Sequence, residues 1–158
     1  MLTVYESPLG RLTIDEHEGV LRGLWMEGQA NFPADVLSAS EPAKGPVADW
    51  LDAYFTGENP ELTFALEPTG TAFQQDVWSA LRDIPYGQTV SYGELATIVG
   101  RKRGTSPASR AVGGAVGKNQ IMNVIPCHRV IGADGKITGY SAGTERKIWL
   151  LEHEAMTR

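Results

Sequence analysis

The sequence is poor in the residues that build disulfides, zinc sites and membrane spans. Its 158 residues include one cysteine, so no internal disulfide can form, and three histidines whose spacing is not typical of zinc ligands. The first residues show no basic start followed by a signal-peptide core, and no later stretch approaches membrane-spanning length. We therefore expect a soluble, cytoplasmic, globular protein in which any chemistry at Cys127 is thiol chemistry.

Positive charge is also scarce, but it is concentrated. The net charge is −5, from 14 basic and 19 acidic residues. Between Leu95 and Ala133 there are six basic residues and no acidic one, so this segment carries +6 and the remainder −11. Such a segment can bind phosphate groups or can be a solvated loop, and composition leaves both interpretations open.

The first half of the chain predicts a small sheet and a helix. Residues 29–46 lack periodicity and predict a loop, residues 47–55 have apolar residues at helical spacing, and residues 61–66 could form another strand. A linker follows, so we place a domain boundary near residue 68. Alternation of apolar and polar residues predicts an antiparallel meander with strands at 2–6, 11–15 and 20–26.

The second half predicts short helices with clear start signals. Two capping boxes and one Ser-Pro pair predict three starts, at Thr71–Gln74, Ser91–Glu94 and Ser106–Pro107. The second helix is expected to end at Gly100 and the third near Val116. Three short helices joined by turns are compatible with a helix-turn-helix.

The third of these helices has small side chains around one long residue, Arg110. Close packing against another helix would explain them, because glycine pairs weaken a helix and usually need a packing reason. A surface that lies in the narrow minor groove of DNA, where binding need not be sequence-specific, would also explain them. The small residues are Ala108, Ser109, Ala111, Gly113, Gly114 and Ala115.

Cys127 lies in the run Ile125-Pro126-Cys127-His128-Arg129-Val130. A lone buried cysteine is ordinarily a small hydrophobic residue. The adjacent histidine and arginine, however, supply a base and a positive potential that would lower the thiol pKa. Neighbours in an extended segment point to opposite sides, so a bridging water or a turn would be needed between Cys127 and His128.

These residues resemble the O6-alkylguanine-DNA alkyltransferases, the methylated-DNA–protein-cysteine methyltransferases that accept an alkyl group irreversibly. The resemblance extends from Ser7 to Glu154 and is weaker through 29–60. It rests on the active-site signature at 126–130, the recognition-helix motif at 109–113, the C-terminal segments 139–141 and 147–154, and the runs 73–78 and 84–87.

The resemblance implies a fold of two domains. Residues 1–67 would form an α/β domain similar to ribonuclease H, with an antiparallel sheet plus a helix. Residues 68–158 would form a mainly α domain with a winged helix-turn-helix that binds DNA and carries the alkyl acceptor.

The resemblance also implies catalytic roles. Cys127 would accept the alkyl group, His128 would act as its base through a water, and Glu154 would orient and polarise His128. Asn119 would fix the turn before the active-site segment, and Tyr92 would help to move the phosphate and donate a proton toward the purine.

The substrate is expected to be double-stranded DNA that carries an alkylated base. The O6 atom lies inside the duplex, so the nucleotide must flip out, and Arg110 would fill the space from the minor groove. Further substrate or DNA contacts are expected from Ala111, Gly113, Gly114, Arg129, Val130, Tyr140 and Ser141. Activity on O4-alkylthymine and cooperative self-association on DNA stay open.

The product would be a thioether, which water does not cleave as it cleaves an acyl thioester. We therefore expect one turnover per molecule, without a cofactor, a metal, a membrane or an obligate protein partner. Two rival functions remain, a lesion-binding module without transfer and a cysteine hydrolase that turns over.

Two segments depart from the family pattern. Family members usually have Asn-Pro where this chain has Asn119-Gln120, which puts the rigidity of that turn in doubt. The stretch 101–106 is longer and more basic than usual, and we expect it to add phosphate contacts.

Overall fold

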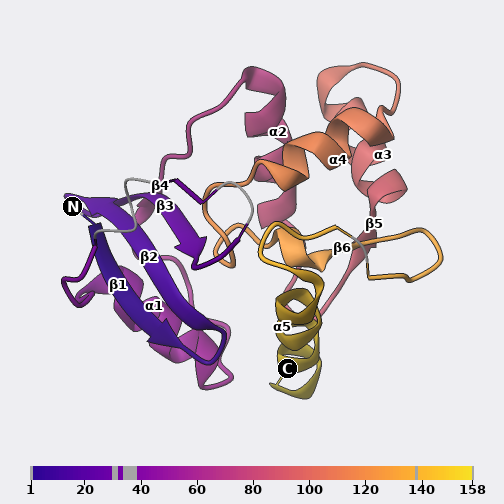
Figure 1. Ribbon diagram of the computed structural model, residues 1–158. Helices are drawn as coiled ribbons and strands as arrows, with labels where there is room; N and C mark the ends of the chain where they lie inside the picture. Colours follow the sequence, from indigo (N-terminus) through magenta and orange to yellow (C-terminus); the bar gives the residue numbers. More distant parts are fainter. Residues whose placement is uncertain (1, 30–31, 34–38, 138, 158) are drawn as a thin grey trace.

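The computed structural model describes residues 2–29, 32–33, 39–137 and 139–157 (Figure 1). Residues 30–31 and 34–38 of the loop predicted at 29–46 therefore lie outside the described residues. Along residues 2–29, 32–33, 39–137 and 139–157, no helix is long and apolar enough to cross a bilayer.

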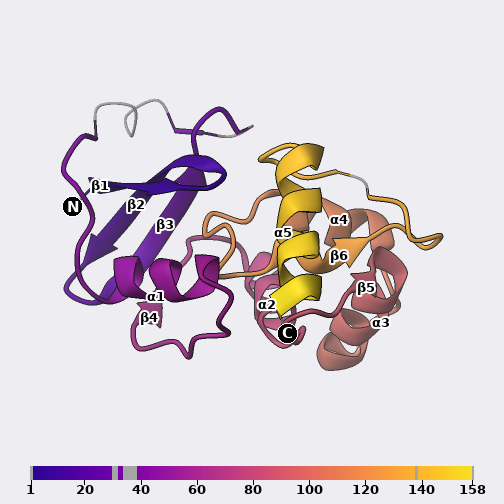
Figure 2. The same cartoon turned by 90° about the horizontal axis from the view of Figure 1, so that it is seen from below.

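The first half of the chain forms a sheet with a helix packed against one face (Figures 1 and 2). The predicted meander is confirmed as antiparallel strands β1 (Leu2–Ser7), β2 (Gly10–His17) and β3 (Val20–Met26). Alternation buries Leu12, Ile14 and Leu24, which share one apolar cluster with Val47 and Leu51 of helix α1 (Pro46–Phe55).

The sheet is mixed rather than purely antiparallel, which corrects the expectation. Strand β4 is limited to Ala65–Leu66 and pairs in parallel with β3, in the order β1-β2-β3-β4. The chain crosses over through α1 between β3 and β4, and such a crossover returns a strand in the parallel direction.

The second half is mainly helical. Both capping boxes are confirmed, at Thr71 before α2 and at Ser91 before α3. The side chain and backbone N–H of each cap residue are hydrogen-bonded to the third helical residue at 3.0–3.1 Å. The elements are α2 (Ala72–Arg82), β5 (Val90–Ser91), α3 (Tyr92–Arg103), α4 (Ser109–Gly117), the 3-10 turn η2 (Cys127–Arg129), β6 (Val130–Ile131) and α5 (Thr144–Thr157).

One predicted helix end and one predicted helix start were wrong. Helix α3 continues past Gly100 to Arg103 and ends at Gly104, which has a left-handed φ of 69°. Gly100 serves close packing instead, because a Cβ there would lie 2.9 Å from the carbonyl oxygen of Thr105. Helix α4 starts at Ser109 rather than at the Ser-Pro pair.

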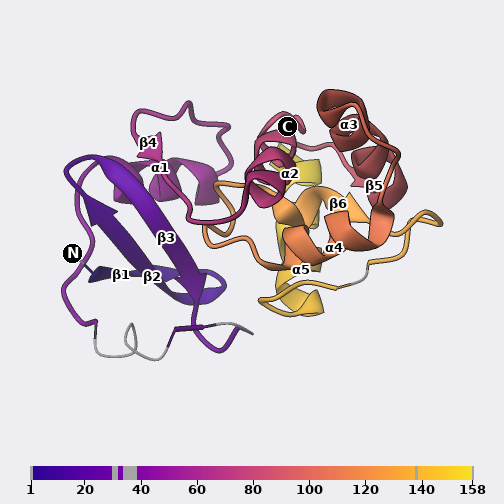
Figure 3. The same ribbon diagram turned by 90° about the horizontal axis from the view of Figure 1, so that it is seen from above.

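The two halves share one continuous apolar core. Figures 2 and 3 show α5 running beside α4 and β6, with α1 and the sheet on the other side of the molecule. The segment before Cys127 joins the halves, since Ile121 forms a parallel bridge with Leu24 of β3. The active-site segment is therefore held directly against the N-terminal sheet.

Candidate active site

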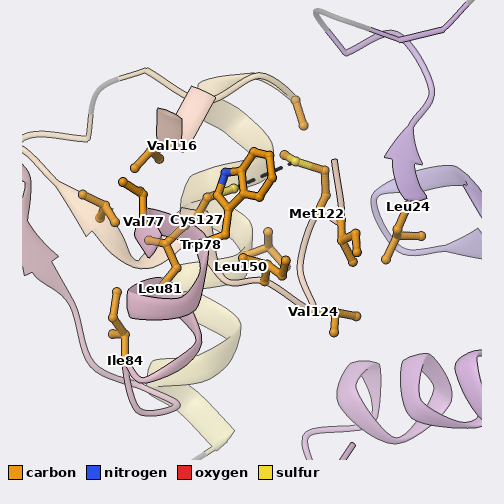
Figure 4. Packing of buried hydrophobic residues seen from close by; sticks show 14 of the residues in the cluster. Leu24, Val77, Trp78, Leu81, Ile84, Val116, Met122, Val124, Cys127 and Leu150 are labelled. Carbon is orange, nitrogen blue, oxygen red and sulfur yellow. Dashed lines mark hydrogen bonds between the residues drawn. The ribbon is translucent and has the colours of Figure 1, made fainter. Parts of the chain in front are cut away.

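Cys127 begins the turn η2 and is 3% exposed. The segment is thus a tight turn, which is one of the two arrangements that the sequence left open for Cys127 and His128. The thiol points toward Met122, and its Sγ lies 3.9 Å from the Met122 Sδ (Figure 4). Val77, Trp78 and Leu81 of α2 belong to the same cluster (Figure 4), so the acceptor sulfur lies in an apolar environment.

His128 and Glu154 meet beneath this turn. The Nε2 atom of His128 lies 2.6 Å from Oε2 of Glu154, and both side chains are fully buried. The other ring nitrogen, Nδ1, has no hydrogen-bond partner among the described residues. A histidine held by a carboxylate through one nitrogen has the other free to exchange a proton.

Within the described part of the chain, Glu154 accepts hydrogen bonds from five donor atoms of four residues. Arg129 donates from Nε to Oε1 at 2.9 Å and from Nη2 to Oε2 at 3.1 Å. The Gly87 amide donates to Oε1 at 3.1 Å, and the Tyr54 hydroxyl donates to Oε2 at 2.6 Å. Burial alone raises the pKa of Glu154, but the hydrogen bonds and charges of His128 and Arg129 outweigh it and hold the pKa below its usual range.

The resting state of the Cys127 and His128 pair is the neutral one. Burial raises the pKa of the Cys127 thiol to about 11, against the opposing effects of Asn119, Lys147 and Tyr140. Burial also lowers the pKa of His128, although Glu154 acts in the other direction. The expectation of a lowered thiol pKa is therefore wrong for the free protein. A neutral thiol must lose its proton before the sulfur can act as a nucleophile.

Arg129 does not lie where the sequence placed it. It was expected to contact substrate or DNA, but it is 9% exposed and its guanidinium is bound to Glu154. Its Nη1 also donates to the Ile84 carbonyl at 2.7 Å, and its guanidinium lies over the Tyr86 ring. The Arg129 guanidinium therefore holds the Glu154 carboxylate, and its positive charge is paired with Glu154 instead of acting on the Cys127 thiol.

Asn119 fixes the turn that leads to the active-site segment. Its Oδ1 accepts from the Ile121 amide at 3.0 Å, and its Nδ2 donates to the Ile125 carbonyl at 2.9 Å. The side chain is 5% exposed, so these bonds are shielded from water. The amide thus bridges backbone groups of the segment that positions Cys127.

Gln120, which replaces the usual proline, ties this turn to the interdomain linker. Its Nε2 donates to the Thr69 carbonyl at 2.8 Å, and its Oε1 accepts from the Thr69 amide at 3.0 Å. Its own carbonyl accepts from the Leu24 amide at 2.8 Å. Hydrogen bonds to the linker and to β3 therefore hold this turn in place of a proline ring.

Tyr92 and Tyr140 lie around the sulfur. Burial raises the pKa of both hydroxyl groups, and the nearby Cys127 raises each of them further; the Tyr140 hydroxyl is buried. Tyr92 is the first residue of α3, and its hydroxyl donates to the Gly139 carbonyl at 3.4 Å. Ser141 donates to the Gly117 carbonyl at 2.9 Å, which ties its segment to the end of α4. Val130 is buried at the start of β6.

Lys147 is a site residue that the analysis of the sequence missed. It is buried, its Nζ lies 5.8 Å from the centre of the Tyr92 ring, and its charge acts to lower the Cys127 pKa. The sequence did contain a signal: Lys147, Leu150 and Glu154 recur at helical spacing and are the buried residues of α5. A lysine on that face indicates a charge inside the protein.

Helix α4 divides its small residues between two faces. Val112, Ala115 and Val116 are buried, and the Trp78 indole donates to the Ala115 carbonyl at 2.9 Å. The opposite face is exposed and consists of Arg110, Ala111, Gly114 and Gly117. Gly113 is half-buried, and a Cβ there would lie 3.9 Å from the Tyr92 ring. Close packing accounts for one face only.

The basic stretch at 101–103 is helical, and part of its charge is already paired. Arg103 contacts Asp76 of α2 at 2.6 Å, and Lys102 lies 3.7 Å from the same carboxylate. Arg103 also lies over the Phe73 ring. The expected loop is thus the last turn of α3, tied to α2 through Asp76.

Comparisons with known proteins agree with this architecture. The family model described as 6-O-methylguanine DNA methyltransferase, ribonuclease-like domain, matches residues 1–68, and the one described as its DNA binding domain matches residues 72–156. The expected fold class, an α/β domain followed by a mainly helical one, is confirmed.

Curated relatives and solved structures are similar over nearly the whole chain. The Mycobacterium tuberculosis methylated-DNA–protein-cysteine methyltransferase is 48% identical over 150 residues, which cover 94% of this chain and 88% of the relative. A relative from Methanosarcina acetivorans with the same description is 41% identical, with 96% of each chain covered. The crystal structure of the Mycobacterium tuberculosis O6-methylguanine methyltransferase superposes with a TM-score of 0.86 at 46% identity, covering 99% of this chain and 93% of the other. A crystal structure of the same organism's protein in complex with DNA has a TM-score of 0.85 at 45% identity, with the same coverage.

Proposed function

The chain belongs to the 6-O-methylguanine DNA methyltransferase family, and we propose that Cys127 is the residue on which its reaction takes place. The activity is direct repair of alkylated guanine by transfer of the alkyl group from damaged DNA to a cysteine. Cys127 is the one cysteine in the sequence. The observation that carries the proposal is the 2.6 Å contact between Glu154 and His128, the residue next to Cys127.

The proposed transfer step follows from the state of these groups. His128 removes the thiol proton through a water, and Glu154 stabilises the imidazolium that forms. The sulfur then attacks the alkyl carbon, the carbon–O6 bond breaks, and its electron pair passes to the guanine. Tyr92, the first residue of α3, would donate a proton to the base as that charge develops. The thioether is stable, so each molecule reacts once.

The exposed face of α4 supports binding in the minor groove. Ala111 and Gly114 let the helix backbone approach the DNA, and Arg110 is the long side chain on that face. We propose that Arg110 enters the stack when the damaged nucleotide flips out. The Val130 backbone and the Ser141 amide would then read the base edge, with Tyr140 as a wall of the pocket.

The proposed domain division is residues 1–67 for the sheet and α1, and residues 68–158 for DNA binding and alkyl transfer. In this division the linker runs through Thr69, which is hydrogen-bonded to Gln120.

Intact-mass measurement tests the acceptor. After incubation with duplex DNA that contains O6-methylguanine, the protein should gain one methyl group on Cys127, and the Cys127→Ala variant should gain none. Binding without a mass increase would instead indicate a lesion-binding module. Release of more product than one equivalent of protein would indicate a hydrolase.

A further inference from the structure

The N-terminal domain contributes a side chain to the catalytic carboxylate. Tyr54 lies on the last turn of α1 and is 1% exposed, and its hydroxyl donates to Oε2 of Glu154 at 2.6 Å. That oxygen is the one that His128 contacts, also at 2.6 Å. Together with Arg129 Nη2 at 3.1 Å, three donor atoms therefore bind this oxygen, and the Tyr54 hydroxyl is the one that comes from the N-terminal domain.

We propose that Tyr54 is a positioning residue for the transfer reaction, which sets the basicity of His128 by competing with it for Oε2 of Glu154. The proposal rests on the function proposed above, in which His128 is the base for Cys127. It assigns the N-terminal domain a part in the chemistry beyond supporting the fold.

The direction of the effect follows from the hydrogen bonds. A hydrogen bond from the phenol withdraws electron density from Oε2 and weakens the support that this oxygen gives to a charged imidazole. With the hydroxyl present, His128 holds its proton less firmly. Without it, Glu154 interacts more strongly with His128, and the imidazolium becomes more stable.

The other charged and titratable groups around Glu154 do not replace this contact. Arg129 from η2 binds both carboxylate oxygens, and Tyr86 from the loop after α2 packs edge-on against the Tyr54 ring at 5.9 Å. His153 on α5 bonds the Tyr54 carbonyl at 2.7 Å rather than Glu154. Three further titratable groups interact with the Cys127 thiol: Lys147, whose charge also opposes protonation of His128, Tyr92 and Tyr140.

A purely structural role for Tyr54 predicts something different. The ring lies 5.9 Å from the Tyr86 ring and 5.2 Å from the His153 ring, both in the second half of the chain, so the ring alone contributes to the packing between the halves. Removal of the hydroxyl from such a residue would alter stability and leave the pH dependence of methyl transfer unchanged. The two roles are therefore separated by a pH profile.

The experiment is single-turnover methyl transfer from O6-methylguanine DNA to the full chain, measured by intact mass between pH 5 and 9. In the Tyr54→Phe variant, the midpoint of the acid limb should move upward by about 0.3 to 1 pH unit relative to the wild type. The matched control is Tyr5→Phe, which removes another hydroxyl of the same domain, one that donates to Asp52 at 2.6 Å. Its acid limb should coincide with that of the wild type.

A second variant keeps the test decisive if Tyr54→Phe does not fold. Replacing Tyr54 by 3-fluorotyrosine retains the hydroxyl and makes it a stronger donor, so the acid limb should move downward. An unchanged limb in both Tyr54 variants, or a shift in the opposite direction, would overturn the proposal while the assigned function stands. Failure of the wild type itself to methylate Cys127 would instead refute the proposed function.

Discussion

Replacement of Arg129 by methionine should destabilise the protein strongly without weakening its interaction with DNA. Methionine retains the apolar stem but removes two hydrogen bonds to Glu154 and one to the Ile84 carbonyl. Breaking a buried ion pair by removal of one partner costs about 3–5 kcal/mol, because the remaining buried charge loses its ionic partner. For a chain of this size that loss corresponds to a fall in Tm of roughly 6–20 °C.

Two measurements distinguish a role of Arg129 in stability from a role in DNA binding. Urea unfolding followed by tryptophan fluorescence gives the loss of stability. Binding to undamaged duplex DNA over a range of salt concentrations, below the unfolding transition, gives the number of phosphate contacts. The slope of log K against log salt should be unchanged for Arg129→Met, whereas loss of a phosphate contact would reduce its magnitude by about 0.9.

The matched control is Arg110→Ala, on the exposed face of α4. It should leave the unfolding free energy within about 0.5 kcal/mol of the wild type and weaken DNA binding. A stability loss of less than about 1 kcal/mol for Arg129→Met, together with a reduced salt slope, would refute the assignment of Arg129 to the Glu154 network.

Three further predictions concern the linker, the basic stretch and acid stability. Gln120→Ala should lower the unfolding free energy by about 1–2 kcal/mol in urea titration, because two hydrogen bonds to Thr69 are lost; an unchanged value would show that the linker bonds contribute nothing. Asp76→Asn should release two basic side chains and make the salt dependence of DNA binding steeper by up to about 2 in the log–log slope; an unchanged slope would mean that this stretch does not reach the phosphates. Below pH 6.5 the unfolded chain protonates His128 before the folded protein does, because the folded pKa is lowered, so stability should fall by up to about 1.4 kcal/mol per pH unit. Glu154, whose folded pKa is also lowered, adds to this loss of stability below pH 4.5. His128→Gln should remove the loss of stability between pH 6.5 and 4.5. An unchanged dependence of stability on pH in this variant would contradict the lowered pKa of His128.

Short sequence motifs predicted helix starts correctly where the hydrogen bonds that start the helix form between residues of the same motif. The two capping boxes start helices because their hydrogen bonds form between residues three positions apart. The helix end predicted at Gly100 was wrong because a glycine can either end a helix or let a neighbouring backbone pack closely. The neighbouring backbone here is that of Thr105. The sequence around Gly100 does not distinguish the two cases.

The candidate site was only partly predictable, because a motif names residues but does not show what a buried side chain contacts. Cys127, His128 and Glu154 could be named from motifs, and the structure brings the last two together at 2.6 Å. The role of Arg129 could not, because nothing near it in sequence shows that its side chain is buried against Glu154 rather than exposed to DNA. Tyr54 lies in the region of weakest resemblance and 100 positions from Glu154, so no motif connected them.

That separation has a consequence for how the protein acquires its reactivity. The contact between Tyr54 and Glu154 closes a loop of 100 residues, and contacts so distant in sequence form only when the two halves of a chain have packed together. On the ribosome, the cysteine is synthesised before the helix that holds its carboxylate. A nascent or partly folded chain therefore contains a thiol with no base fixed beside it, and the ability to consume an alkyl group arises together with the finished tertiary structure.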